Sequence, residues 1–112
     1  MIRLSEEITL KDFKKLDIRI GNIAQVEKIP GSDKLYKLKV DMGDEVRQIV
    51  TGLVGYYTAD ELKGMKIAVL MNLKPAKIFG QVSNGMLLAA ESGDKLSLLT
   101  VDREIPNGAK VT

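Results

Sequence analysis

The stretch NLKPAKIFGQVSNGMLLAAE, residues 72–91, places two apolar runs around a middle that neither a strand nor a helix crosses easily. Pro75 lacks a backbone N–H and does not fit inside a sheet ladder, while Gly80 and Gly85 favour backbone conformations that other residues avoid. The middle carries two lysines and several neutral hydrogen-bonding side chains, and it contains no acidic residue. The sequence therefore predicts a shaped loop between two strands, suited to an anion or a base edge.

The composition excludes several classes of functional site. The chain has 112 residues with no cysteine and no histidine, so disulfides, thiol nucleophiles, histidine metal sites and imidazole catalysis are excluded. Adjacent carboxylates such as Asp44 and Glu45 point in different directions on a strand or helix, so they make no acid–base dyad. We expect no catalytic residue, no metal site and no cofactor.

The length predicts one domain over residues 1–112, near the size at which about two-thirds of the unfolded surface is buried. A subunit partner would therefore add stability. Charged side chains among residues 1–13 indicate that no signal peptide is present, and no apolar run has the length of a membrane span. We expect a cytoplasmic protein without a membrane partner.

The net charge of +2 is unevenly distributed. Residues 28–40 carry four lysines against Asp33, and residues 63–80 carry four lysines against no acidic residue, whereas residues 41–62 have a balance of −4. A fold that joins the two basic segments would have a positive face. Taken alone, either segment fits a solvated face equally well.

Periodicity and capping signals predict mostly short strands with two short helices. Thr9 with Asp12, and Thr58 with Glu61, match helix N-terminal caps. An extended run at residues 18–29, in which Gly21 suggests a bulge or a sharp coil, precedes an alternating hairpin over residues 36–50. Further strands are predicted at residues 65–73, 86–90 and 96–101.

The order of three strands, a short helix and two strands is that of the OB-fold, an all-β, five-stranded Greek-key barrel that binds oligonucleotides. Residues 92–112 would then form a C-terminal β extension to a core at about residues 13–91. In this architecture residues 28–35 connect strands 1 and 2, and residues 74–84 connect strands 4 and 5. These two basic loops lie at one rim of such a barrel, so we expect them to converge.

Five ordered blocks carry a specific resemblance: LDIRIGNI at 16–23, GSDKLYKLKVDMG at 31–43, IVTGL at 49–53, NLKPAKIFG at 72–80 and SNGMLLAA at 83–90. Together they resemble the tRNA-binding domain family. That family includes stand-alone tRNA-binding proteins, the C-terminal domain or beta subunit of methionyl-tRNA synthetase, and the endothelial monocyte-activating polypeptide II module. Thr51 stands where many members have serine, and it keeps the hydroxyl.

The resemblance implies a non-catalytic homodimer that recognises tRNA by its shape, as a beta subunit or trans-acting accessory of a methionyl-tRNA synthetase catalytic chain. A-form RNA hides its base edges in a deep groove, so backbone geometry and exposed bases are what such a protein reads. Carried over to matching positions, the candidate RNA contacts are Lys34, Asn72, Lys74, Lys77, Ser83 and Met86.

Two of these candidates, and the further aromatic residue Tyr36, have an ordinary structural alternative. Ser83 could be a turn hydroxyl that bonds nearby backbone, and Met86 could fill the core. Tyr36 could stack a base on strand 2, although its alternation with Leu38 and Val40 equally fits the core.

An alternative function is a chaperone-like or cytokine-like module that binds polypeptide. An exposed apolar groove would favour that function, whereas a basic rim would favour tRNA. We also expect residues 92–112 to lie at a dimer interface. The apolar side chains that would form this interface are Leu96, Leu98, Leu99, Val101, Ile105 and Val111, with Ile2, Leu4 and Ile8 from the N-terminus.

Overall fold

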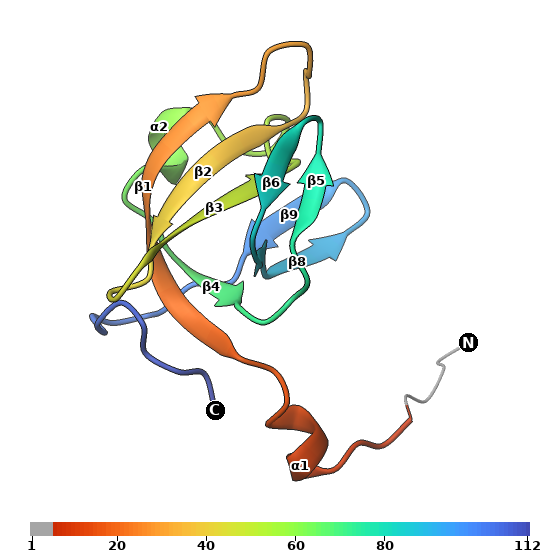
Figure 1. The fold of residues 1–112 in the computed structure, drawn as a ribbon, viewed down its shortest axis with the longest axis vertical. Coiled ribbons are helices and arrows are strands. Elements are labelled where there is room, and N and C mark those ends of the chain that lie inside the picture. Colours follow the sequence, from red (N-terminus) through yellow and green to blue (C-terminus); the bar gives the residue numbers. More distant parts are fainter. Residues whose placement is uncertain (1–5) are drawn as a thin grey trace.

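A five-stranded antiparallel sheet forms the body of the protein in the computed structural model, which describes residues 6–112 (Figure 1). Its strands, in the order β3-β2-β1-β4-β7, are β1 (Ile18–Lys28), β2 (Tyr36–Asp41), β3 (Val46–Thr51), β4 (Lys66–Leu70) and β7 (Met86–Leu87). Because β7 also lies against β3, the sheet curls into a nearly closed barrel. This arrangement confirms the predicted all-β, OB-like barrel.

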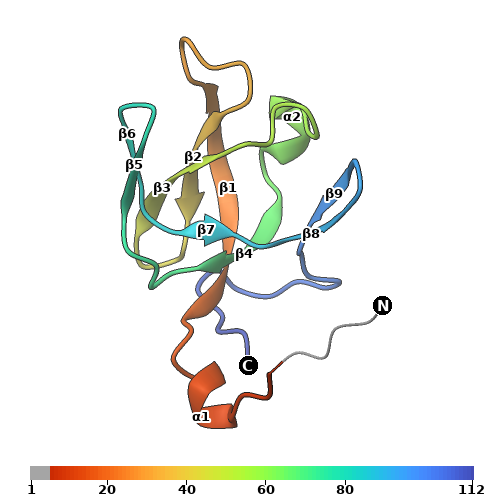
Figure 2. The same cartoon turned by 90° about the vertical axis from the view of Figure 1, so that its right-hand side faces the viewer.

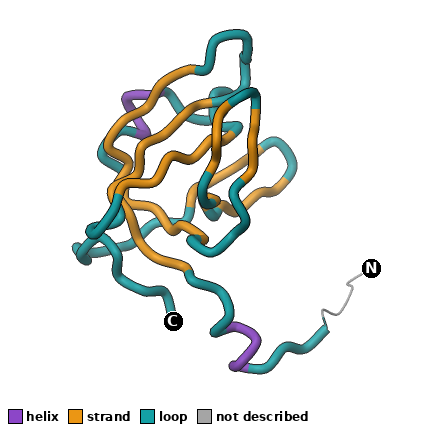
Figure 3. The backbone as a smooth tube through the Cα atoms, in the orientation of Figure 1, coloured by secondary structure: helices purple, strands orange, loops and turns teal. Residues whose placement is uncertain are grey.

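Two small hairpins project from this barrel (Figures 2 and 3). One pairs β5 (Ala76–Ile78) with β6 (Gln81–Ser83), and the other pairs β8 (Ala89–Ser92) with β9 (Lys95–Leu98). The predicted loop at residues 74–84 therefore contains a hairpin of its own, which begins directly after Pro75. The predicted strand at 86–90 is split into β7 and β8, and the strands at 65–73 and 96–101 are shorter than predicted.

Both predicted helices are present as single turns, α1 (Leu10–Phe13) and α2 (Ala59–Leu62). Each begins with a reciprocal capping box, formed by Thr9 with Asp12 and by Thr58 with Glu61. The hydrogen bond from the Thr58 backbone lowers the pKa of Glu61 below its usual value. Helix α1 stands away from the barrel in Figure 1. No helix among residues 6–112 has the length and apolarity needed to cross a membrane.

Strand β1 is bulged, but not at the glycine where the sequence predicted it. The register of β1 against β2 shifts between Ile23 and Gln25, whereas Gly21 pairs regularly with β4. A Cβ atom at Gly21 would lie 2.4 Å from the sulfur of Met42 and 2.9 Å from a methyl of Val40. Gly21 is therefore needed for the close approach of β2, and the predicted bulge at this residue is wrong.

The alternation in β2 buries one face of the strand, as predicted. Tyr36, Leu38 and Val40 are buried in the main core, together with side chains from β1, β3, β4 and α2. The Tyr36 ring is only 2% exposed, and its hydroxyl donates to the Tyr57 carbonyl at 2.9 Å. The suggestion that Tyr36 stacks a base is therefore wrong, and its role is in the core.

The C-terminal residues are joined to β1 by backbone hydrogen bonds, which limits what they offer to a partner. The Ile20 backbone N–H donates to the Ala109 carbonyl, and the Val111 N–H donates to the Ile18 carbonyl. Residues 109–111 therefore run antiparallel to the first residues of β1. Leu98 belongs to the main core, and Val111 packs on a second cluster around Ile18 and Ile20. Of the apolar side chains expected at an interface, those left exposed are Ile8, Leu99 and Ile105, while Ile2 and Leu4 lie outside the described residues.

Candidate nucleic-acid interface

The β5–β6 hairpin is fastened to β3 by hydrogen bonds from side chains and backbone. The Gln48 side chain donates to the Val82 carbonyl at 3.0 Å, and the Asn84 backbone donates to the Gln48 carbonyl at 2.8 Å. The Val50 backbone donates to the Ser83 hydroxyl at 3.0 Å. The hairpin is therefore held in a defined position beside the barrel.

Arg47 joins the two ends of the hairpin segment. Its guanidinium donates to the Met71 carbonyl at 2.9 Å and to the Asn84 side-chain oxygen at 3.2 Å. It also bonds Glu45 at 2.5 Å, and this hydrogen bond lowers the pKa of that carboxyl. A planar guanidinium suits this task because it presents several donors in a fixed fork.

The sequence did not single out Arg47 or Gln48 as site residues. A signal was present, since Arg47 is the one cation in the acidic stretch of residues 41–62. The sequence could not show that both side chains bond carbonyls at or before the β5–β6 hairpin, because these carbonyls lie more than twenty residues away along the chain.

Ser83 and Met86 lie at a groove of about 290 Å³ between β3 and the hairpin. Ser83 is buried, accepts from Val50 and donates to the Gly85 carbonyl at 3.4 Å, as in the alternative that made it a backbone-bonding hydroxyl. Met86 is 44% exposed and so is not core filling. The other groove residues are mostly apolar, among them Ile49, Leu73, Ala76 and Ile78.

Asn72 uses its side-chain amide to hold the chain that precedes β1. Its oxygen accepts from the Asp17 backbone at 2.9 Å, and its nitrogen donates to the Lys15 carbonyl at 2.7 Å. Both polar atoms of the side chain are thus engaged by protein. In this structure Asn72 positions the segment between α1 and β1 beside the start of the hairpin.

Lys34, Lys74 and Lys77 are exposed, and none of them forms an ion pair with another residue of the described chain. Lys66, from the same basic segment, instead bonds the Ile105 carbonyl and pairs with Glu104 at 3.6 Å. The lysines of residues 63–80 are therefore divided between the two ends of β4.

The two basic loops meet at one end of the barrel, as predicted. The tip of the hairpin and the β1–β2 loop lie at the same end in Figures 1 and 2. A Cβ atom at Gly31 in the β1–β2 loop would lie 3.3 Å from the ring of Phe79 at the hairpin tip. The result is a rim with exposed lysines on both sides, next to an apolar groove.

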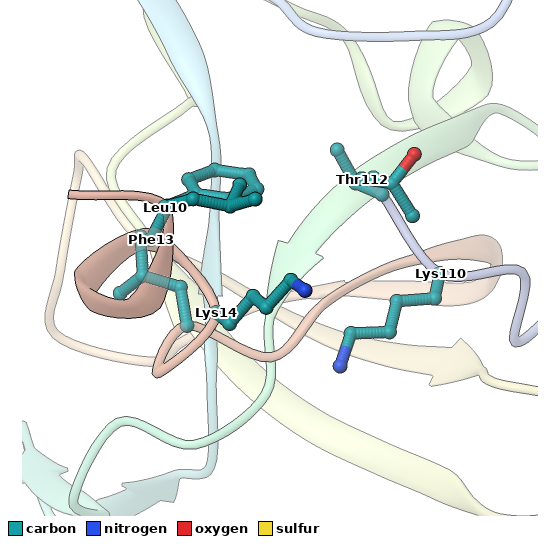
Figure 4. A pocket seen from close by; sticks show the side chains of 7 residues that line it. Leu10, Phe13, Lys14, Lys110 and Thr112 are labelled. Carbon is teal, nitrogen blue, oxygen red and sulfur yellow. The ribbon is translucent and has the colours of Figure 1, made fainter.

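A second apolar cavity, of about 310 Å³, lies between α1 and the C-terminal segment (Figure 4). Leu10 and Phe13 from α1 line one part, with Lys14 on the α1 side and Lys110 on the C-terminal side. Leu10 is largely exposed. This cavity is separate from the rim, because it shares none of the groove residues.

Residues 18–110 match the family described as "putative tRNA binding domain". The chain is 55% identical over 105 residues to a methionine–tRNA ligase of Thermotoga maritima, and 51% identical over 107 residues to one of Methanocaldococcus jannaschii. These alignments cover 94% and 95% of this chain but only 17% and 16% of the two ligases. The chain thus spans about a sixth of the length of these relatives.

Solved structures with the same fold carry two kinds of description. The "MetRS related protein" of Pyrococcus horikoshii superposes with a TM-score of 0.91 at 41% identity, covering 96% of this chain and all of that one. The "chaperone CsaA" of Bacillus anthracis superposes with a TM-score of 0.86 at 27% identity and the same coverage.

Proposed function

Because the chain belongs to the putative tRNA-binding domain family, we propose that it binds folded tRNA at the rim formed by the β1–β2 loop and the β5–β6 hairpin, without catalysing a reaction. The observation that carries this proposal is the set of exposed lysines that no described carboxylate neutralises, on a hairpin fixed to the barrel. When a lysine neutralises a phosphate, counterions condensed on the RNA are released, and this release drives binding.

The candidate residues take two kinds of role in this proposal. Lys34, Lys74 and Lys77 contact phosphates, and Met86 offers apolar contact at the groove. Asn72 and Ser83 act through the backbone they hold, because their polar atoms already have protein partners. Exchanging a lysine should therefore change affinity alone, whereas exchanging Ser83 should change stability as well.

We also propose a link to aminoacylation. The chain would act in the cytoplasm as a beta subunit or trans-acting accessory that delivers tRNA to a methionyl-tRNA synthetase catalytic chain. Support comes from the identity of about half of its residues to a segment of methionine–tRNA ligases. Co-purification of this chain with the synthetase from its source tests the partnership. Association that survives ribonuclease treatment supports a subunit, association lost with the tRNA supports a trans-acting accessory, and no association contradicts the partnership.

We further propose that the protein is a homodimer. Leu10, Leu99 and Ile105 are apolar side chains with at least a third of their surface exposed, and α1 stands apart from its own barrel. Light scattering should give about twice the 12.3 kDa of one chain. Leu10→Asp should weaken the dimer, whereas Val46→Asp, at an exposed residue of the β2–β3 hairpin, should not. A mass of one chain at micromolar concentration contradicts the proposal.

Polypeptide binding is the second candidate function. Two observations favour it: the groove beside β3 is largely apolar, and one structural relative is described as a chaperone. An unfolded segment would place apolar side chains in this groove and would not need the lysines. Its affinity should therefore depend little on salt.

A filter-binding comparison separates the two functions. The protein is titrated into folded tRNA, into single-stranded RNA of the same length, and into a permanently unfolded polypeptide. We expect folded tRNA to bind most tightly, at one tRNA per dimer. Equal affinity for both RNAs would leave only generic polyanion binding, and preference for the polypeptide would favour the second function.

A further inference from the structure

The tip of the β5–β6 hairpin holds an aromatic residue in a backbone conformation that disfavours it. Phe79 and Gly80 form a two-residue turn between Ile78 and Gln81, with φ values of 53° and 79°. Turns with two positive φ values strongly favour Asn-Gly or Asp-Gly, and a bulky side chain there is an outlier. Phe79 is the one non-glycine residue with positive φ in residues 6–112.

Core packing does not account for this residue. The Phe79 side chain is 57% exposed, more than most other apolar side chains of the described chain. Its ring edge lies near Gly31, at the tip of the β1–β2 loop, where a Cβ atom would be 3.3 Å away. The ring edge thus approaches a loop residue that has no side chain, and most of the Phe79 surface stays exposed. Strained residues of this kind cluster at functional sites.

The charges on and beside the hairpin indicate what kind of partner the Phe79 ring would bind. Lys77 lies two residues before Phe79 on β5, and Lys74 precedes the hairpin. No acidic residue occurs between residues 62 and 90. An exposed aromatic ring among unpaired lysines suits a ligand that is both anionic and aromatic, because lysines contact phosphates while the ring stacks a base.

We propose that Phe79 is a stacking platform for an unpaired or terminal base of the bound RNA. This inference rests on the proposed tRNA binding and adds the residue that contacts a base rather than the backbone. Stacking of a base on an aromatic ring contributes strongly to affinity, and it accepts any base because every base has a flat aromatic face. Phe79→Ala should therefore weaken tRNA binding roughly 5-fold to 150-fold while leaving the salt dependence unchanged.

The turn itself gives an independent test. Phe79→Asn places a favoured residue at the positive φ, so its thermal midpoint should equal or exceed that of the wild type. Its affinity for tRNA should fall as far as that of Phe79→Ala. Phe79→Leu keeps the apolar bulk but loses the ring, and it should not restore binding. A lower midpoint for Phe79→Asn would mean that Phe79 serves packing and would overturn the inference.

Fluorescence gives the direct readout, because the chain contains no tryptophan. Phe79→Trp introduces a single reporter at the turn, and Val82→Trp places a matched one on the same hairpin, at a residue that is 50% exposed. Folded tRNA transcript, at a concentration that saturates each variant, should quench Phe79→Trp strongly and Val82→Trp weakly. If both variants bind tRNA with equal, small quenching and Phe79→Ala binds as the wild type does, the inference fails while tRNA binding stands. If wild-type protein binds no tRNA in the filter assay, the proposed function fails first.

Discussion

Two hairpins of this protein follow opposite designs. In the β2–β3 hairpin, β2 alternates buried and partly buried residues, and Gly43 takes the left-handed backbone conformation in the connecting turn. In the β5–β6 hairpin, every β5 residue is exposed, and the left-handed position before Gly80 holds Phe79. The first hairpin uses its side chains for the core, and the second presents them to solvent.

This difference indicates where stability and binding reside. The β5–β6 hairpin contributes little buried surface, so its position depends on hydrogen bonds from β3 rather than on packing. Substitution of its lysines or of its aromatic residue should then have little effect on the free energy of unfolding. Variants of the buried β2 side chains should therefore destabilise the protein, whereas variants of the exposed side chains of the β5–β6 hairpin should weaken binding alone.

The largest contrast is expected from truncating one apolar side chain in each hairpin. Leu38→Ala, at a fully buried residue of β2, should lower the free energy of unfolding by about 2–5 kcal/mol. Ile78→Ala, at a residue of β5 that is 36% exposed, should lower it by distinctly less, because part of the side chain already meets solvent. Urea denaturation measures both. Equal losses would mean that the exposed hairpin is part of the cooperative core.

The next effect tests the close approach of β1 and β2. Gly21→Ala should cost about 1–3 kcal/mol, because its Cβ would overlap the Met42 sulfur and a Val40 methyl. Gly55→Ala is the matched control, since within residues 6–112 only Gly55 itself and its two chain neighbours have atoms within 4 Å of the added Cβ. Its stability should be unchanged or slightly raised. Comparable stability of Gly21→Ala and the wild type, in the same thermal melts, would show that the packing of β2 on β1 does not require glycine at this residue.

Ser83 tests the bond that joins the hairpin to the barrel. Ser83→Ala leaves the buried Val50 N–H without its acceptor, which should cost about 1–3 kcal/mol of stability. Hydrogen exchange at the Val50 amide should speed up with it. Ser97→Ala removes an exposed hydroxyl and serves as the control. Unchanged exchange at Val50 in Ser83→Ala would show that another acceptor replaces the hydroxyl.

The smallest effect concerns the cap of helix α2, which lies outside both hairpins, and it depends on pH. The hydrogen bonds from Thr58 lower the folded-state pKa of Glu61, so its carboxylate stabilises the fold above about pH 4.3, the usual value in the unfolded chain. This stabilisation is lost as the pH falls through the lower folded-state pKa. The gap in thermal midpoint between wild type and Glu61→Gln should therefore close in acid. A gap that widens in acid has the wrong sign for this cap.

Much of the fold could be predicted because its signals are local. The period-2 pattern at residues 36–42 and the caps at Thr9 and Thr58 depend only on nearby residues, and all three are confirmed. The role of Gly21 depends on Met42, and the C-terminal pairing depends on β1, so neither could be predicted from a local pattern.

The candidate site also contains features that could be predicted from the sequence and features that depend on residues distant in the chain. The convergence of the two basic loops followed from the barrel topology, and the proximity of Gly31 to the Phe79 ring confirms it. Tyr36 and Met86 were ambiguous because alternation does not say which face is covered, and the structure buries the first and exposes the second. Arg47 was missed because its partners are distant in sequence.

The central claim is that the rim with the β5–β6 hairpin binds tRNA through its lysines and the RNA phosphates. The most direct test is the salt dependence of tRNA affinity for Lys74→Ala/Lys77→Ala, beside Lys63→Ala/Lys95→Ala as a control. Both pairs remove two exposed lysines and lower the net charge from +2 to 0. The hairpin pair should weaken binding to every tRNA and flatten the slope of log affinity against log salt by about 0.7–0.9 for each phosphate that is no longer neutralised, with the control pair near wild type. If the two pairs keep the same affinity and the same slope, the hairpin is only a solvated surface and the claim is wrong.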